Sequence, residues 1–324
     1  MSAASRAVLS IAVGKPVYLA MAVNLARSFK RWHQDSDIRF VLATDQPDMV
    51  PSDLHDIEIV TLAPGEYGIG FAPKLHLDRM TPADRTLFVD GDCLCVGPLD
   101  RVFAGFAGRA VSVVGGYISS GEWFGDVASV CRQFGVPAIL KFNGGVYYLE
   151  RGEMSSRVYR MARELEPRYD EIGLVRLRGR PNDELLMAIA MAVHGQVPVP
   201  DDGSVLSDPQ ACPGPIELDV LRGGSTLTNP APPHPRHMAW YPHWKVHPVL
   251  VHFLDFYTTK HPYRREERRL SLTVARGWPI WVADAVAAVT QSLPLLAKDW
   301  VKTVLRPLYR RLFGYRAIAP SERM

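Results

Sequence analysis

Two aspartates separated by one residue, Asp90 and Asp92, are the side chains in this sequence best suited to chemistry. They follow the apolar run Leu87–Val89 and precede a second apolar run, Cys93–Val96. In an extended chain, residues i and i+2 point to the same face, so the two carboxylates lie close together and repel each other. Oxygen ligands of this kind suit Mg²⁺, Mn²⁺ or Ca²⁺, ions that commonly also hold substrate phosphates. The spacing therefore indicates a divalent-cation site, and the alternative is an acidic turn between two strands.

Alternating strands and helices are predicted around this pair. The expected strands are Ala7–Val13, Ile38–Thr44, Ile57–Leu62, Thr86–Val89, Ala110–Val114 and Gly145–Leu149, and the expected helices are Val17–Trp32, Lys74–Met80 and Glu184–Ala192. Such alternation is typical of an α/β domain with a largely parallel sheet. Ligands of these sheets bind beyond the carboxyl ends of the strands, which is where Asp90 and Asp92 lie.

Composition places the chain among globular proteins. Of 324 residues, 47% are hydrophobic and 22% charged, which is enough apolar material for a sizeable core. The four cysteines form no C-x-x-C pair, and we expect reduced, buried thiols in a cytoplasmic protein. The N-terminus lacks the layout of a secretory signal, and no uninterrupted run of eighteen apolar residues occurs. We therefore expect no helix that spans a membrane.

The net charge of +3 is unevenly distributed. From Arg264 to Met324 there are twelve basic and five acidic residues, whereas the rest of the chain holds 25 basic and 29 acidic residues. Around Trp300–Phe313, apolar residues recur at helical spacing and basic residues take the other positions. This pattern predicts a helix lying in the plane of an anionic membrane surface, and the alternative is a helical pair packed on the body. The mildly acidic body argues against nucleic acid as a partner.

Further motifs surround the aspartate pair. In chain order they are KLH at 74–76, LFVDGDCLCVGPLD at 87–100, FNGGV at 142–146, NDELL at 182–186 and VHFL at 251–254. Each is weak alone, but together this series resembles the GT-A glycosyltransferases, and within them the glycogenin-like retaining family, known as family eight. The resemblance extends from about Ala7 to Lys260.

The resemblance implies a fold and an activity. The expected fold is GT-A: a Rossmann-like, mostly parallel mixed sheet with flanking helices, formed by residues 1–262 and followed by a basic amphipathic helical segment at 263–324. The implied enzyme uses Mn²⁺ or Mg²⁺ to move a hexose from a UDP-sugar to a glycan or lipid-linked acceptor, with retention. A lipid-linked acceptor would place the protein peripherally on the inner face of the membrane.

The resemblance also assigns roles to residues. Asp92 and His252 would bind the metal directly, and Asp90 would bridge the metal and the donor. Asp183 and Asn143 are the implied catalytic residues; Asp183 can also be the N-cap of the helix that follows it, and both roles can hold at once. The further implied donor contacts are Ala12, Val13, Gly14, Tyr18, Asp45, Lys74, Gly91, Gly144, Gly145 and Lys260.

Several of these positions have a simpler interpretation. The ring of Tyr18 can stack on a uracil base or pack in the core, and Asp45 can contact the donor or cap a turn. Lys74 can contact phosphate or Asp90, or remain solvated. Two positions depart from the family pattern: Glu184 stands where the family has Gln, and a longer stretch precedes Lys260.

Two rival functions have sequence support. A haloacid-dehalogenase-like phosphatase also carries D-x-D after an apolar strand, but its strand lies near the start of the domain. Here several predicted strands precede Asp90, and the later pair Asp201-Asp202 lies in a proline-rich stretch. A catalytically inactive sugar-nucleotide-binding protein is the second rival. Complete Asp90, Asp92 and His252 argue against it.

Overall fold

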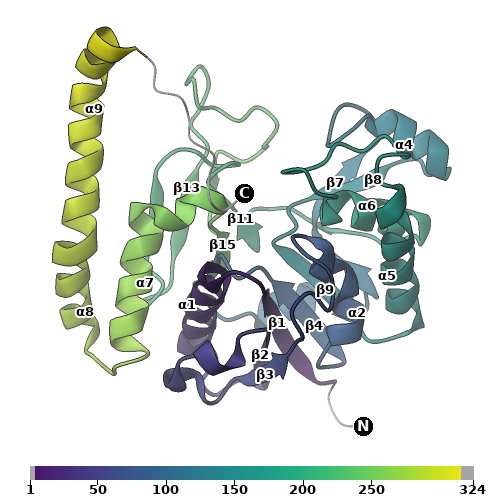
Figure 1. Cartoon of the computed structure of the whole chain (residues 1–324), viewed down its shortest axis with the longest axis horizontal. Helices are drawn as coiled ribbons and strands as arrows, with labels where there is room; N and C mark the ends of the chain where they lie inside the picture. Colours follow the sequence, from purple (N-terminus) through teal and green to yellow (C-terminus); the bar gives the residue numbers. More distant parts are fainter. Residues whose placement is uncertain (1–3, 315–324) are drawn as a thin grey trace.

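A six-stranded mixed sheet forms the centre of the molecule (Figure 1). The computed structural model describes residues 4–314, apart from the side chain of Asp255. From edge to edge the strands are β3 (Glu58–Thr61), β2 (Ile38–Thr44), β1 (Arg6–Ala12), β4 (Arg85–Val89), β9 (Val146–Glu150) and β6 (Val111–Ser112). The first four run parallel, and β9 is antiparallel to both of its neighbours. The predicted α/β fold with a mostly parallel sheet is thus confirmed.

Alternation of side chains along the strands creates a core on each face of this sheet. In β1, Ala7 and Leu9 belong to one hydrophobic cluster, while Val8 belongs to the other. In β9, Tyr147 and Tyr148 divide in the same way. Both faces must be covered by helices, because each carries a continuous apolar surface.

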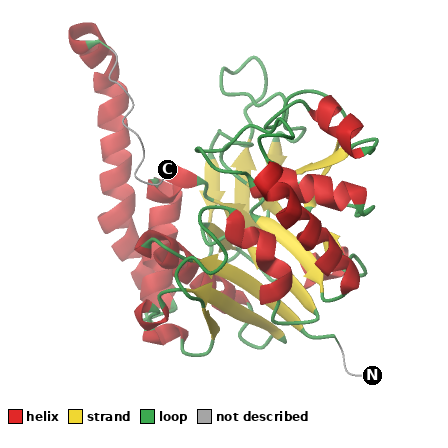
Figure 2. Ribbon diagram, turned by 45° about the vertical axis from the view of Figure 1, so that its right-hand side comes forward, coloured by secondary structure: helices red, strands yellow, loops and turns green. Residues whose placement is uncertain are grey.

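Helices cover both faces of the sheet, and further helices lie beside the body (Figure 2). Helix α1 packs on one face and contacts β1, β2 and β5, while α6 packs against α5 and β8 on the other. The helices are α1 (Pro16–Trp32), α2 (Leu77–Met80), α3 (Asp100–Phe106), α4 (Val127–Phe134), α5 (Glu153–Leu165), α6 (Asp183–Val193), α7 (His261–Thr273), α8 (Ile280–Ala287) and α9 (Leu293–Phe313). Short 3-10 turns occupy Pro47–Met49, Ser52–Leu54, Ala72–His76, Glu166–Arg168 and Asp255–Thr259.

Three small sheets extend the body. The first consists of β10 (Val199–Pro200), β7 (Val114–Ile118) and β8 (Ile139–Phe142). The second consists of β11 (Leu206–Ser207), β15 (Leu250–His252) and β5 (Cys93–Cys95). The third consists of β12 (Ile216–Leu218), β13 (Ser225–Thr228) and β14 (Lys245–Val246). The antiparallel pairing of β15 with β5 sets His252 opposite Cys93. It thereby brings the late VHFL motif to the aspartate loop.

Two predicted elements differ from the structure. The strand expected at Ala110–Val114 divides into β6 and β7, which belong to different sheets. A glycine allows β7 to cross close to β8, because a Cβ on Gly115 would lie 2.2 Å from the carbonyl oxygen of Lys141. The helix expected at Lys74–Met80 is a 3-10 turn at Ala72–His76 followed by the single turn of α2.

The C-terminal helices differ from the body in burial. Helix α7 joins a third hydrophobic core through Tyr263 and Leu270, whereas α9 contains no buried residue and all of its residues except the half-buried Leu295 are exposed. The division at residue 262 stays a prediction, and the change from buried to exposed falls later, between α7 and α9. A π-helical turn at Ala288–Ser292 links α8 to α9.

One helical stretch within the described residues is long and apolar enough to cross a membrane by length and composition. It is Ile280–Phe313, whose most apolar eighteen-residue window has a mean hydropathy of 1.5. The prediction that no helix spans a membrane was based only on the absence of an uninterrupted run of eighteen apolar residues. It overlooked an apolar segment interrupted by a few polar residues.

Candidate active site

The loop between β4 and β5 holds the aspartate pair at the carboxyl end of the parallel strands. Asp90 donates its backbone N–H to the carbonyl oxygen of Gly145 at 2.9 Å, which ties the loop to the start of β9. Gly91 lies against helix α1, and a Cβ there would meet the Cβ of Ala22 at 3.3 Å. Gly91 therefore serves the close packing of this loop on α1. Its expected donor contact stays a prediction.

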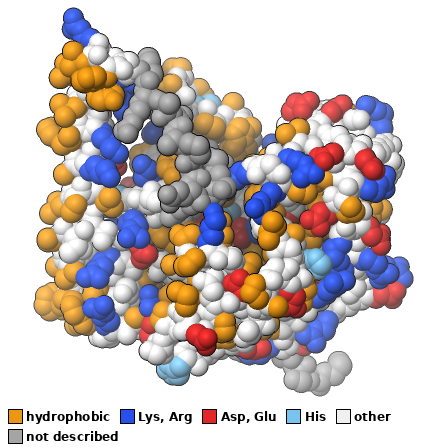
Figure 3. All heavy atoms as spheres, viewed as in Figure 1, with side chains coloured by type: hydrophobic (Ala, Val, Ile, Leu, Met, Phe, Trp, Pro, Cys, Tyr) orange, Lys and Arg blue, Asp and Glu red, His pale blue; other side chains and the backbone are white. Residues whose placement is uncertain are grey.

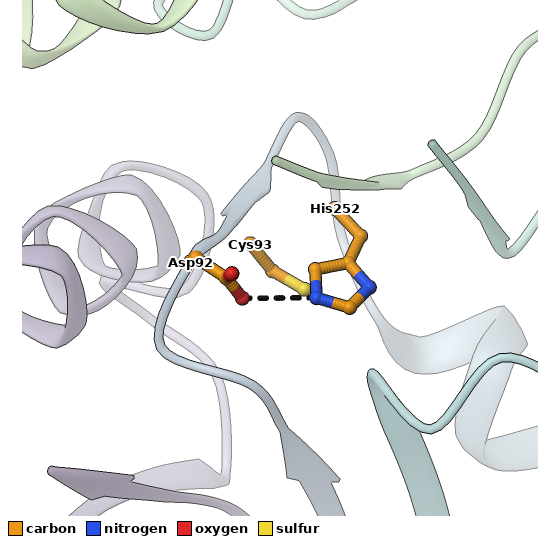
Figure 4. Close-up of side chains that lie close together, drawn as sticks. All are labelled: Asp92, Cys93 and His252. Carbon is orange, nitrogen blue, oxygen red and sulfur yellow. Dashed lines mark ion pairs between the residues drawn. The ribbon is translucent and has the colours of Figure 1, made fainter. Parts of the chain in front are cut away.

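His252 comes to Asp92 from more than a hundred and fifty residues further along the chain. Its Nε2 lies 2.9 Å from Oδ1 of Asp92 and 3.7 Å from Oδ2 of Asp90. Figure 4 shows the imidazole facing the carboxylate of Asp92, with the sulfur of Cys93 beside the ring. Burial lowers the pKa of His252, but the charge and hydrogen bond of Asp92 outweigh this and raise it to about 9. The pair is therefore an imidazolium–carboxylate ion pair.

Lys74 lies on the other side of Asp90. Its Nζ is 2.5 Å from Oδ2 of Asp90 and donates to the carbonyl oxygen of Gly144 at 3.0 Å. Burial lowers the pKa of Lys74, but the carboxylates of Asp90 and Asp183 raise it overall, so the ammonium is charged. Of the two interpretations from the sequence, the contact with Asp90 is confirmed and the solvated lysine is wrong. Contact with phosphate stays a prediction.

Asn143 joins the histidine to a carboxylate that the sequence interpretation did not include. Its Oδ1 accepts from the backbone N–H of Gly145 at 2.8 Å and lies 2.9 Å from Nδ1 of His252. Its Nδ2 donates to Oδ2 of Asp208 at 2.8 Å. Asp208 directly follows the two-residue strand β11, and no motif marks it. Asn143 thus orients the imidazole, and its expected catalytic role stays a prediction.

The two glycines of the FNGGV motif, Gly144 and Gly145, are packed too closely against neighbouring side chains to carry a Cβ. A Cβ on Gly145 would lie 2.5 Å from Nδ1 of His252, and one on Gly144 would lie 2.9 Å from Cγ of Glu184. Side chains at these positions would displace His252 or Glu184. The sequence predicted close approach here to a sugar; the structure shows close approach to protein groups, and the sugar contact stays a prediction.

Asp183 begins helix α6 inside the body, with 2% of its surface exposed. Its Oδ2 accepts from the hydroxyl of Tyr147 at 2.6 Å, and burial raises its pKa. The N-cap is Asn182, whose side chain accepts from the backbone N–H of Glu184, so the N-cap interpretation of Asp183 is wrong. Asp183 is therefore available for a role other than capping.

Glu184 occupies the position where the family pattern has Gln. Its Oε1 accepts from the backbone N–H of Gly144 at 2.6 Å. Burial, followed by the charge of Asp183, raises the pKa of Glu184 to about 7. This carboxyl group consequently changes charge near neutral pH, which a glutamine could not do.

The expected nucleotide contacts lie at the ends of β1 and β2. Ala12 is buried and Val13 half-buried, and the backbone N–H of Gly14 donates to both oxygens of Asp45, at 2.9 and 3.1 Å. Asp45 thus binds the turn that follows β1 and does not cap its own turn, and the expected donor contacts of Ala12, Val13, Gly14 and Asp45 stay predictions. The half-buried ring of Tyr18 packs at the edge of the core between α1 and the sheet.

Lys260 does not join this group of residues. It immediately precedes α7, and its Nζ lies 5.4 Å from the ring centroid of Phe256. In the part of the chain that the structure describes, no ion pair joins Lys260 to Asp90 or Asp92. Its expected role as a phosphate ligand stays a prediction.

A cleft of about 760 Å³ opens beside these residues. Asn143, Glu184 and Asp208 are among its polar lining residues. Aromatic side chains also line it: Tyr117, Trp123, Phe124, Phe142, Trp240 and Tyr241. A concave site that combines flat apolar surfaces with a few convergent polar groups is typical of small-ligand binding.

The donor atoms fit a hard divalent cation. Ligand atoms of Asp92, Cys93 and His252 all lie within 4.8 Å of one another, and Asp90 adds a further carboxylate oxygen nearby. Carboxylate and imidazole ligands suit Mn²⁺ or Mg²⁺. Burial raises the pKa of Cys93 well above its usual range, so its thiol stays protonated and is a poor ligand for such ions. The four thiols are buried and free, as predicted.

Comparison with known proteins identifies the fold. No family model and no curated protein matches the sequence. Among solved structures, the galactosyltransferase LgtC bound to donor and acceptor sugar analogues matches with a TM-score of 0.50 and 15% identity, covering 77% of this chain and 87% of that one. The bifunctional glycosyltransferase WbbM matches with a TM-score of 0.50 and 9% identity, covering 85% of this chain and 52% of that one. The chain has the GT-A fold of these glycosyltransferases.

Proposed function

We propose that this protein is a metal-dependent glycosyltransferase of the glycogenin-like family that moves a hexose from a UDP-sugar to a glycan or lipid-linked acceptor, with retention. The observation that carries the proposal is the convergence of Asp90, Asp92, Lys74 and His252 at the carboxyl end of the parallel strands. A largely buried cluster of two carboxylates, an imidazole and an ammonium beside an aromatic cleft is an arrangement that suits a charged donor.

The charged groups of the cluster would serve the leaving diphosphate. Asp92 and His252 would hold the cation, which supplies positive charge to the diphosphate oxygens as the glycosidic bond breaks. Asp90 would be shared with Lys74, whose ammonium keeps that carboxylate oriented. His252 must lose its proton to bind the cation, and Asn143 can then accept from Nδ1–H and hold the ring in place.

Asp183 would act on the transferred sugar. It is adjacent in sequence to Glu184, which binds the Gly144 amide, and the hydroxyl of Tyr147 fixes one of its oxygens. A positioned carboxylate can stabilise the positive charge that develops at the anomeric carbon, as in glycosidases. Retention of configuration is part of the proposal and follows from the family pattern.

The aromatic cleft would receive the acceptor sugar. Tyr117 and Trp240 are 55% and 56% exposed, so flat apolar faces are open to a ligand. Lys141 lies 5.3 Å from the ring centroid of Trp240. The apolar faces of a sugar ring can pack on such side chains, and Asp208 and Asn143 line the same cleft.

The phosphatase alternative has little support from the fold. Strand β4 lies inside the sheet after three earlier strands, and the molecule has the fold of glycosyltransferases. Asp202, from the later acidic pair, accepts from the backbone and hydroxyl of Ser204 and serves its own turn. An inactive sugar-nucleotide-binding protein would have the same site, so activity must be measured.

Incubation with a panel of UDP-sugars and Mn²⁺, followed by assay of released UDP, tests the proposal. We expect metal-dependent release from at least one UDP-hexose, and nuclear magnetic resonance of the product should show the anomeric configuration of the donor. Binding of UDP without release from any donor, with or without a panel of glycan acceptors, would favour the inactive protein. An inverted product would exclude the retaining family.

A further inference from the structure

Many of the exposed large hydrophobic residues of the described molecule lie on a helix outside the body. Helix α9 contains no buried residue, and Trp300, Leu308 and Leu312 are 67%, 56% and 64% exposed. Figure 3 shows hydrophobic side chains gathered along the outer edge of the helical segment, with lysine and arginine side chains between them and the body. Contiguous exposed apolar patches mark interaction sites on soluble proteins.

The sequence of α9 sorts its residues onto two faces. Basic residues recur every fourth position at Lys298, Lys302, Arg306 and Arg310, and apolar residues do the same at Trp300, Val304 and Leu308. At 3.6 residues per turn, the two rows are separated by about 160° around the helix axis. The apolar row is widened by Leu293, Leu296, Ala297, Val301 and Leu312. The separation is incomplete, because Arg311 falls on the apolar side, Leu305 lies between the rows, and Tyr309 and Phe313 fall on the basic side.

We propose that the apolar face of α9 docks on an anionic lipid bilayer, with the helix lying in the plane of the membrane surface. Apolar side chains enter the boundary between headgroups and acyl chains, and the basic residues are attracted by the negative surface potential. From Leu293 to Phe313 the helix holds five basic residues and one acidic residue, so its charge complements anionic lipid. This proposal does not depend on the proposed transfer reaction.

The contacts of α8 favour an in-plane helix over a spanning one. Asp284 accepts from Nε of Arg269 at 2.8 Å and from Arg222 at 2.6 Å, and Ala283 and Ala287 are fully buried. A window of eighteen residues with few charges must start at or next to Ile280, so a spanning helix would include Asp284. Insertion would break these ion pairs and leave the buried Arg269 with fewer partners, at a large energetic cost.

Sedimentation of the full-length protein with lipid vesicles tests the proposal. We expect it to pellet with vesicles of phosphatidylcholine and phosphatidylglycerol, and to remain in solution with phosphatidylcholine alone. Salt should weaken the binding, because the basic row acts through screened charge. Replacing Lys302 and Arg306 by glutamine should weaken binding about fivefold for each residue.

Apolar-face variants separate docking from simple charge attraction. The double substitution Trp300→Ser and Leu308→Ser should weaken binding by at least about tenfold. The matched control Ile69→Ser with Val175→Ser removes side chains that are 69% and 58% exposed on the body, and should bind as the natural protein does. Unchanged thermal unfolding of both double variants verifies that they are folded.

Several outcomes would overturn the proposal. Equal sedimentation with neutral and anionic vesicles would exclude an anionic surface as the partner. Full binding by the apolar-face variant would show that charge alone suffices. A dimer in solution that this variant abolishes would identify a second copy of the chain as the occupant, and resistance to alkaline carbonate extraction from cell membranes would identify a spanning helix.

Discussion

The site cluster and helix α9 break the usual rule of burial in opposite directions. At the site, His252 is buried and Asp90 and Lys74 are partly buried, and each of these charged groups has an oppositely charged partner within 4 Å. In α9, large apolar residues are exposed. Burying charge and exposing apolar surface both cost free energy.

The comparison indicates where the chain is expected to bind a partner: a cation at the site and an anionic surface at α9. Two carboxylates held together attract a cation, and an apolar helix face with basic neighbours attracts an anionic surface. The site is preorganised by contacts to several strands, whereas α9 is a single element joined to the body through α8. Removing one side chain at the site should therefore impair function. Removing one exposed side chain from α9 should hardly change the stability of the folded protein.

The largest effect is expected from Asp92→Asn. This change removes the negative charge opposite His252 while keeping an oxygen that can accept from Nε2. We expect Mn²⁺-supported UDP affinity to fall about a thousandfold, equivalent to about 4 kcal/mol. Titration calorimetry with UDP in Mn²⁺ and in EDTA measures the effect.

Asp48→Asn supplies the matched control for this experiment, because Asp48 is an exposed carboxylate outside the cluster. It should leave UDP affinity unchanged. If the natural protein binds UDP equally well in EDTA and in Mn²⁺, the metal site is wrong.

A smaller effect, on turnover, is expected from Asp183→Asn. Because this carboxylate would stabilise charge that develops in the transition state, kcat should fall about a hundredfold while the KM for the donor changes little. Steady-state kinetics on the best UDP-sugar decides this. Asn182→Ala is the control: loss of the helix cap should cost about 1 kcal/mol of stability and leave kcat near its natural value.

An effect on pH-dependent stability is expected at Glu184. Its pKa rises from 4.5 to about 7 on folding, so the folded state binds this proton more tightly than the unfolded state does. The stabilisation is complete below pH 4.5, declines between pH 4.5 and 7, and is lost above pH 7. Glu184→Gln keeps the hydrogen bond from Gly144 and cannot ionise.

Urea unfolding across this pH range measures the difference. Relative to the natural protein, Glu184→Gln should gain about 2 kcal/mol between pH 4.5 and 7, since partial exposure reduces the effect of the full shift. A constant difference across the range would show that Glu184 titrates normally in the folded protein.

The smallest effect is expected in α9. Trp300→Ser should change the unfolding free energy by about 0.5 kcal/mol or less in the absence of lipid, because the side chain is already exposed. Tyr263→Ala in the buried part of α7 should cost about 3 kcal/mol or more. A large loss of stability from Trp300→Ser would mean that α9 packs on protein in solution, and the contrast with the site would fail.

Much of the fold and part of the site could be predicted from local pattern. Strand Ile38–Thr44 was predicted to the residue, and the other main strands were close, because apolar runs bounded by turns determine strands locally. The aspartate pair was found because its spacing alone places both carboxylates on one face. Asp208 could not be found in this way, since it follows a strand of two residues in a proline-rich stretch.

The sequence by itself determined the α/β fold, the Asp90–Asp92 pair and the two faces of α9, because strand and helix periods are properties of neighbouring residues. Tertiary structure alone decided that Lys74 reaches Asp90, that Asn143 links His252 to Asp208, and that Lys260 lies elsewhere. It also decided the pKa values of Glu184 and His252. The physical reason is that burial and charge depend on side chains brought together from distant segments, which the order of residues does not reveal.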